Sequence, residues 1–169
     1  MSGSLLKEPL QLSGALDQYD SFDVTPIIGR EFPTANLKQW LRAANSDALL
    51  RDLAITVSQR GVVFFRKQGD MDDSLQKELA QRLGELSGKP KTSGLHIHPI
   101  LNSNRKMGGD DDKISILSRK MERTLWNQMI EPELRQSATV EWHVDIPFEA
   151  CPSDYAVLRL TELPNCGGG

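Results

Sequence analysis

Apolar residues recur every three or four positions in the first half of the chain, which is the spacing of a helix with one buried face. The first such stripe consists of Leu49, Leu50, Leu53, Ala54 and Val57. Ser46 precedes the stripe as an N-cap candidate, and Gly61 follows it as a stop signal. The pattern therefore predicts a helix between these two residues, and a shorter helix is predicted over residues 36–44.

A second apolar stripe at the same spacing lies further along, at Leu75, Leu79, Leu83 and Leu86. The polar residues just before it offer three candidate caps, Asp72, Asp73 and Ser74. Gly88 and Pro90 are expected to end this helix. The run Val62-Val63-Phe64-Phe65 stands between the two long helices, and its β-branched and aromatic residues predict a buried strand.

The second half of the chain has a different pattern. Residues 89–112 are rich in Gly, Pro, Ser, Asn and Asp, so they predict a long loop, interrupted by an extended piece at residues 95–101. Three strands are predicted beyond the loop, at residues 113–117, 140–148 and 155–160. Alternation in the last strand places Arg159 opposite its two neighbouring leucines, and we expect this arginine to face solvent.

The order of these elements indicates an α+β chain. The first 21 residues are polar and aperiodic, so they are expected to form a flexible tail, and residues 22–169 then form one domain. Helices come early and strands come late. A sheet that ended with the last predicted strand would leave a long unpaired edge. The sequence thus reads as one that stops partway through its β-structure.

Composition excludes several classes of protein. The net charge is −3, which argues against a generally basic nucleic-acid-binding protein. No apolar run approaches the roughly 18 residues of a membrane span, and the N-terminus lacks the features of a secretory signal. Two cysteines are too few for a disulfide scaffold. We therefore expect a cytoplasmic protein without a nucleic-acid or membrane partner.

The clearest chemical signal is Trp142-His143-Val144-Asp145, inside a predicted strand. Alternation would direct His143 and Asp145 to the same face. An imidazole beside a carboxylate supplies two parts of the 2-His-1-carboxylate triad that holds Fe(II). For the tripeptide taken alone, a hydrogen-bonded structural histidine beside a surface aspartate is the commoner arrangement.

The context of this motif resembles the taurine/sulfonate dioxygenase family of the TauD/TfdA type, which depends on Fe(II) and 2-oxoglutarate. The resemblance covers roughly residues 22–169, with several motifs in the same order. In chain order these are Arg60-Gly61-Val62-Val63-Phe64-Phe65-Arg66, Leu79 to Leu86, His96-Ile97-His98-Pro99, Trp142 to Phe148, Pro152, Tyr155-Ala156-Val157-Leu158, Glu162-Leu163-Pro164 and Gly167-Gly168.

The resemblance implies a double-stranded β-helix, or jelly roll, with helices outside it. It also implies that His143 and Asp145 are iron ligands and that His98 contacts a sulfonate-like or other small anionic organic substrate, with O2 and 2-oxoglutarate as co-substrates. Two family positions differ, because Leu101 replaces a tyrosine and Thr139 replaces an asparagine. Both changes argue against taurine itself and suggest a fungal-type relative with a bulkier or less polar substrate.

The family's distal iron histidine and the residues that bind 2-oxoglutarate are expected beyond Gly169, so the jelly roll would be incomplete here. Two alternatives follow. The chain could be a catalytically inactive truncated product, or it could be a small cupin-like metal-binding protein that uses His96, His98, His143 and Asp145. The sequence leaves open a homo-oligomer.

Overall fold

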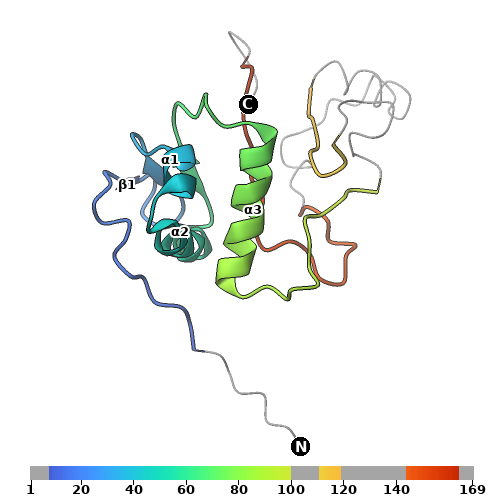
Figure 1. Ribbon diagram of the computed structural model, residues 1–169, viewed down its shortest axis with the longest axis horizontal. Helices are drawn as coiled ribbons and strands as arrows, with labels where there is room; N and C mark the ends of the chain where they lie inside the picture. Colours follow the sequence, from blue (N-terminus) through green and yellow to red (C-terminus); the bar gives the residue numbers. More distant parts are fainter. Residues whose placement is uncertain (1–7, 100–110, 119–143, 164–169) are drawn as a thin grey trace, which may run out of the picture. The chain divides into compact units, whose positions relative to one another are not determined.

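The computed structural model describes three stretches of the chain, residues 8–99, 111–118 and 144–163. The chain divides into two compact units. One unit joins Met1–Gly94 to Tyr155–Gly169, and the other is Leu95–Asp154. A three-stranded sheet and three helices belong to the first unit (Figure 1). No helix in the described stretches combines the length and the apolar character needed to cross a bilayer.

The helices form where their local signals predict them, as α1 (Leu37–Arg42), α2 (Ser46–Arg60) and α3 (Asp73–Ser87). The side chain of Asn36 caps α1 by accepting from the Gln39 amide at 2.8 Å. Asp72 caps α3 in the same way through the Leu75 amide, also at 2.8 Å. Gly88 ends α3 in the left-handed conformation that favours glycine. The helix predicted over residues 36–44 is thus shorter, with Asn36 as its cap, Asp72 is the one of the three candidate caps that binds, and the predicted end at Gly88 is confirmed.

The start of α2 differs by one residue from the prediction. Ser46 is the first helical residue rather than the cap, and Asn45 occupies the cap position without a side-chain cap bond. Ser46 is 6% exposed, so its side chain faces the interior. Gly61 ends the helix as predicted, with its amide donating to the Val57 carbonyl at 2.8 Å.

The sheet consists of β1 (Phe22–Asp23), β2 (Arg30–Phe32) and β3 (Val63–Phe65). β2 lies in the middle, antiparallel to β1 and parallel to β3. The register aligns Phe22, Glu31 and Phe64, which therefore share one face. Phe22 and Phe64 are 52% and 41% exposed on that face. The strand predicted at residues 62–65 therefore forms over Val63–Phe65, but it is not buried throughout: Val62 and Phe64 are exposed, and Val63 and Phe65 are partly buried.

Trp40 stands at the centre of the core and is only 1% exposed. Its ring contacts those of Tyr19, Phe32 and Phe65, at centroid distances of 4.8 to 5.6 Å. Phe32 and Phe65 also stack on each other at 5.6 Å. Phe32 and Phe65 come from β2 and β3, so this cluster joins the inner face of the sheet to α1. Packing of these large rings contributes strongly to the core.

A buried carboxylate ties the N-terminal segment to α2. Asp52 is fully buried, and it accepts hydrogen bonds from the Ser13 amide at 2.9 Å, the Ser13 hydroxyl at 3.0 Å and the Ala15 amide at 3.0 Å. Leu16 is buried in the same segment. Residues 13–19 fall in the stretch expected to be a flexible tail. They are nevertheless packed, because a buried acid on α2 satisfies their polar groups.

Ion pairs link the three helices at the surface. Arg42 of α1 forms a two-bonded pair with Glu78 of α3, at 2.7 and 2.9 Å. Arg82 of α3 donates to Asp47 of α2 at 2.6 Å. Hydrogen bonding from Arg42 lowers the pKa of Glu78. Since this pKa is lowered on folding, the stabilisation by the Glu78 carboxylate is present above its unfolded pKa and is lost as the pH falls through the folded value.

The strands expected in the second half do not form in the described residues. Residues 113–117 have no strand, and residues 144–148 form a bend and a turn. Residues 140–143 lie outside the described stretches. Residues 155–160 are extended, but they join no described strand. Hydrogen-bonded strands need partners, and the local apolar pattern does not specify them.

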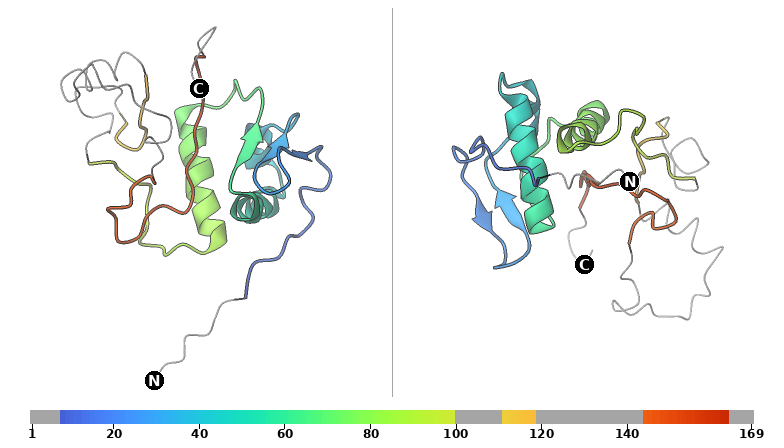
Figure 2. Two further views of the ribbon diagram at one scale, coloured as in Figure 1. Left: turned by 180° about the vertical axis from the view of Figure 1, so that it is seen from behind. Right: turned by 90° about the horizontal axis from the view of Figure 1, so that it is seen from below.

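The segment Tyr155–Leu160 does show the predicted alternation, but with the opposite face inward. Tyr155 and Val157 pack against the core, and Gln76 of α3 donates to the Val157 carbonyl at 2.9 Å. Arg159 donates to the Met71 carbonyl at 2.6 Å and pairs with Asp73 at the start of α3. The expectation that Arg159 faces solvent is therefore wrong. The exposed positions are the apolar ones, including Leu158 and Leu160 at 75% and 67%. Figure 2 shows the segment running beside α3.

Gly61 offers a test of the turn between α2 and β3. Its φ is +72°, and an added Cβ would lie 3.1 Å from two side-chain carbons of Ile28. We expect Gly61→Ala to lower the free energy of unfolding by about 1–2 kcal/mol, because L-residues are strained at positive φ. Urea unfolding measures this change. Gly69→Ala is the matched control, since Gly69 has an ordinary φ and open space around it. Equal stability of the two variants would contradict the prediction.

Candidate functional site

Two histidines lie close together in the unit Leu95–Asp154. His96 and His98 belong to an extended segment without strand partners, and both are partly buried. Their ring centroids are 5.9 Å apart and the ring planes meet at 87°. Phe148 lies near both, 6.5 Å from the ring of His96 and 5.8 Å from that of His98. The three rings therefore form one cluster.

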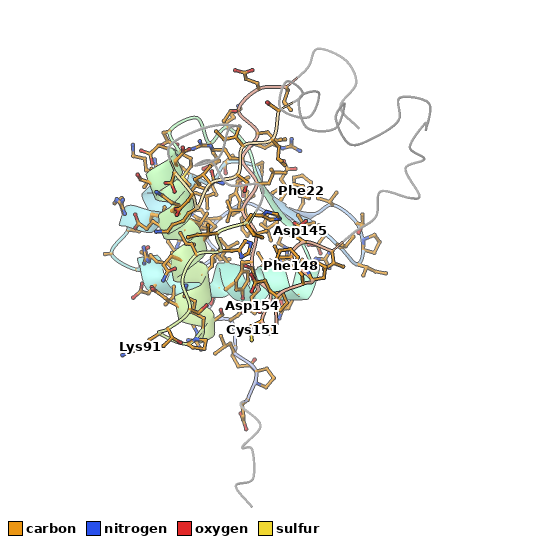
Figure 3. The ribbon with its side chains drawn as sticks, turned by 90° about the vertical axis from the view of Figure 1, so that its right-hand side faces the viewer. Phe22, Lys91, Asp145, Phe148, Cys151 and Asp154 are labelled. Atoms are coloured by element: carbon orange, nitrogen blue, oxygen red, sulfur yellow. The ribbon has the colours of Figure 1, made fainter. Side chains whose placement is uncertain are left out.

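Phe148 reaches the histidines from the turn that follows Asp145. The Glu149 amide donates to the Ile146 carbonyl at 3.2 Å, which closes the turn. Ile146 has a φ of +45°, an unusual conformation for a β-branched residue. Asp145, Phe148, Cys151 and Asp154 are labelled along this stretch in Figure 3. The strained turn thus connects the proposed carboxylate ligand to the aromatic ring beside the histidines.

Glu149 brings a negative charge to His96. A carboxylate oxygen lies 3.8 Å from Nδ1 of this histidine. Nε2 on the opposite side of the ring is buried and has no hydrogen-bond partner among the described residues. The carboxylate therefore lies beside the Nδ1 edge of the ring, at a distance longer than a hydrogen bond.

Of the two predicted iron ligands, the structure describes one. Asp145 is exposed and lies in a bend, while His143 lies outside the described stretches. Asp145 is therefore not part of a strand, and strand alternation does not determine which way its side chain faces. Its carboxylate is an oxygen ligand of the kind that binds Fe(II) together with imidazole. The chemistry of the donors thus fits iron, and their geometry is a prediction.

The cupin-like alternative receives no support from the described part of the chain. It requires His96, His98 and Asp145 to converge with His143. Among residues 8–99, 111–118 and 144–163, no group of three or more His, Cys, Asp or Glu side chains could hold a metal ion. Three of the four required ligands are within these stretches, and the fourth, His143, lies outside them, so the four-ligand site stays a prediction.

The sequence predicted His98 as a substrate contact and His96 as a candidate metal ligand, but it gave Phe148 and Glu149 no role of their own. Phe148 follows the His-x-Asp motif by three residues and entered only through the family pattern. A single glutamate beside a predicted strand is an ordinary surface residue, so Glu149 carried no signal. Leu101 and Thr139, the two positions that depart from the family pattern, lie outside the described stretches.

Comparison with known proteins gives consistent matches. Residues 20–169 match the family described as "Taurine catabolism dioxygenase TauD, TfdA family". The chain is 53% identical over 161 residues to the alpha-ketoglutarate-dependent dioxygenase oryG of Aspergillus oryzae, covering 95% of this chain and 46% of that protein. It is 51% identical over 166 residues to btcD of Neocamarosporium betae, a dioxygenase of the same description, covering 95% and 47%.

A more distant relative carries a substrate class in its name. The alpha-ketoglutarate-dependent sulfonate dioxygenase of Saccharomyces cerevisiae is 26% identical over 145 residues, covering 86% of this chain and 31% of that protein. The chain thus spans about half the length of the first relatives and less of this one. No solved structure matches it significantly.

Proposed function

The chain belongs to the TauD/TfdA family of taurine catabolism dioxygenases, and from this we propose that it forms part of an Fe(II)- and 2-oxoglutarate-dependent dioxygenase acting on a small anionic organic substrate. The observation that carries the proposal is the match of 95% of the chain to alpha-ketoglutarate-dependent dioxygenases at 51% and 53% identity. The activity is proposed for a chain of the relatives' length, of which these residues make up about half.

His143 and Asp145 are the proposed protein ligands to iron within this sequence. When bound, Fe(II) with 2-oxoglutarate would supply the electrons that activate O2 for oxidation of the substrate. Asp145 would contribute a hard anionic oxygen, and His143 an imidazole whose second nitrogen needs a partner to fix its orientation. The remaining protein ligand is assigned to residues outside this sequence.

The jelly roll is the proposed architecture around this site. Phe22 and Phe64 are exposed on the sheet face that they share with the ion-paired Glu31, and Leu158 and Leu160 are exposed from the extended segment beside α3. Exposed apolar surface of this kind is normally covered in a folded protein. A further layer of β-structure over these residues would cover it while leaving α2 and α3 outside.

Succinate formation tests the proposed reaction. A chain extended to the relatives' length should convert 2-oxoglutarate to succinate in the presence of Fe(II), and a chelator should stop this conversion. Candidate sulfonates and carboxylates that accelerate it then define the substrate class. Fe(II)-independent turnover, or no turnover with any anionic compound, would contradict the proposal.

His98→Ala is expected to weaken binding of the organic substrate more than binding of 2-oxoglutarate. A neutral imidazole donates one hydrogen bond to an anion, and a protonated imidazole adds charge. We expect the KM for the organic substrate to rise about tenfold or more, because hydrogen bonds to charged groups contribute about 1.5–3 kcal/mol. Steady-state kinetics with each substrate varied in turn measure the difference. Equal rises in both KM values, or none, would make His98 a structural loop residue.

A further inference from the structure

His98 makes perpendicular ring contacts with two neighbours. The plane of His96 meets that of His98 at 87°, and the plane of Phe148 meets it at 86°. Perpendicular ring pairs at such centroid distances attract through their quadrupoles, so each ring resists rotation of the other. Removing either neighbour would remove one of the ring contacts that restrict rotation of the His98 imidazole about its side-chain bonds.

His96 is itself held from two sides. Phe148 packs against its ring, and the neighbouring Glu149 faces its Nδ1 at 3.8 Å. The other nitrogen, Nε2, is buried. A buried nitrogen cannot reach a ligand that arrives from solvent, so His96 is poorly suited to bind one directly. Its environment is that of a support for the ring beside it.

We propose that His96 is a positioning residue. Held by Glu149 and Phe148, it orients the imidazole of His98 for contact with the organic anion, and it does not bind the anion itself. The binding of the anion by His98 rests on the proposed function. The orientation of His98 by His96 rests on the ring contacts alone, so the two parts can fail separately.

The first measurement concerns ring orientation in the 169-residue chain. The chain contains only three histidines, so selective labelling gives few imidazole signals. His96→Ala should shift the ring protons of His98 and change its contacts with the ring of Phe148 in nuclear Overhauser spectra. His96→Phe keeps a ring and should restore most of the His98 shifts. Unchanged His98 signals in His96→Ala would overturn the proposal.

The second measurement uses methanesulfonate as the anionic probe. His98 signals should shift saturably on titration, with sodium chloride at equal ionic strength as the control. His96→Ala should weaken this binding about three- to tenfold, the worth of one aromatic pair. Because His96 acts through His98, the double variant should bind no more weakly than His98→Ala alone. Additive losses would overturn the proposal by making His96 an independent contact.

Glu149→Gln separates the carboxylate from the ring. It should alter the nitrogen shifts of His96 and change methanesulfonate binding only slightly, whereas Asp154→Asn, in the same unit, should alter neither. If methanesulfonate fails to bind the parent chain, the anion-binding role of His98 fails. The ring-proton measurement then still decides whether His96 orients His98.

Discussion

Asp145→Ala is expected to abolish Fe(II)-dependent succinate formation by a chain of the relatives' length. The substitution removes the only anionic protein ligand proposed for the metal. Loss of a residue that merely orients a ligand commonly costs about 10- to 100-fold, so loss of a ligand itself should cost more than about 100-fold. His143→Ala should have an effect of the same order, since it removes the imidazole of the pair.

A second readout separates metal binding from catalysis. Both variants should bind Fe(II) more weakly in an anaerobic titration, even where no turnover can be measured. Asp154→Ala is the matched control, because Asp154 is an exposed aspartate of the same unit and has no proposed contact with the metal. Retention of more than about a tenth of parent activity by Asp145→Ala would remove Asp145 from the proposed ligands.

Four of the six helix ends carry local signals that made them predictable. Asn36 and Asp72 bond to amides three residues ahead, and Gly61 and Gly88 adopt the positive φ that ends a helix. All of these interactions span a few residues. The start of α2 and the end of α1 lack such a signal, and there the prediction differs from the structure by one or two residues.

The sheet was harder to predict because its partners are distant. β2 has only three residues, and its mixed sequence Arg30-Glu31-Phe32 lacks an apolar alternation. It becomes a strand because Val63–Phe65 pairs with it from more than 30 residues away. Such pairing depends on how α1 and α2 pack, which no single stretch of sequence specifies.

Arg159 shows how alternation can be right while its direction is wrong. The neighbouring leucines suggested that the arginine would face outward. In the structure the guanidinium finds two acceptors at the start of α3, the Met71 carbonyl and the Asp73 carboxylate. A charged side chain can thus occupy the inner face of an extended segment when a helix start offers partners. Periodicity alone does not reveal such partners.

The candidate site was predictable in its residue types and not in its contacts. Asp145 was predicted from the His-x-Asp spacing, and His98 from the resemblance to the family. The cluster of His96, His98 and Phe148 depends on a turn at residues 146–149 that brings a later segment back to an earlier one. Long-range contacts of this kind are set by the fold around them.

Asp52→Ala is expected to produce the largest loss of stability of any single polar substitution in the helical unit. The carboxylate is fully buried and accepts three backbone or hydroxyl donors from Ser13 and Ala15. Each buried donor left without a partner costs about 1–3 kcal/mol, although water can reach some of them once the segment loosens. We therefore expect the free energy of unfolding to fall by about 2–4 kcal/mol, measured by urea unfolding of the 169-residue chain.

The same substitution should release the N-terminal segment before the helices unfold. The Ser13 and Ala15 amides should lose their protection from hydrogen exchange, and Tyr19 should lose its contact with Trp40, while amides within α3 stay protected. Asp47→Ala is the matched control, because Asp47 lies on the same helix with its side chain 79% exposed in a surface ion pair. Such pairs contribute less than about 1 kcal/mol. If Asp52→Ala were no more destabilising than Asp47→Ala, the buried carboxylate would not be what anchors residues 13–19 to α2.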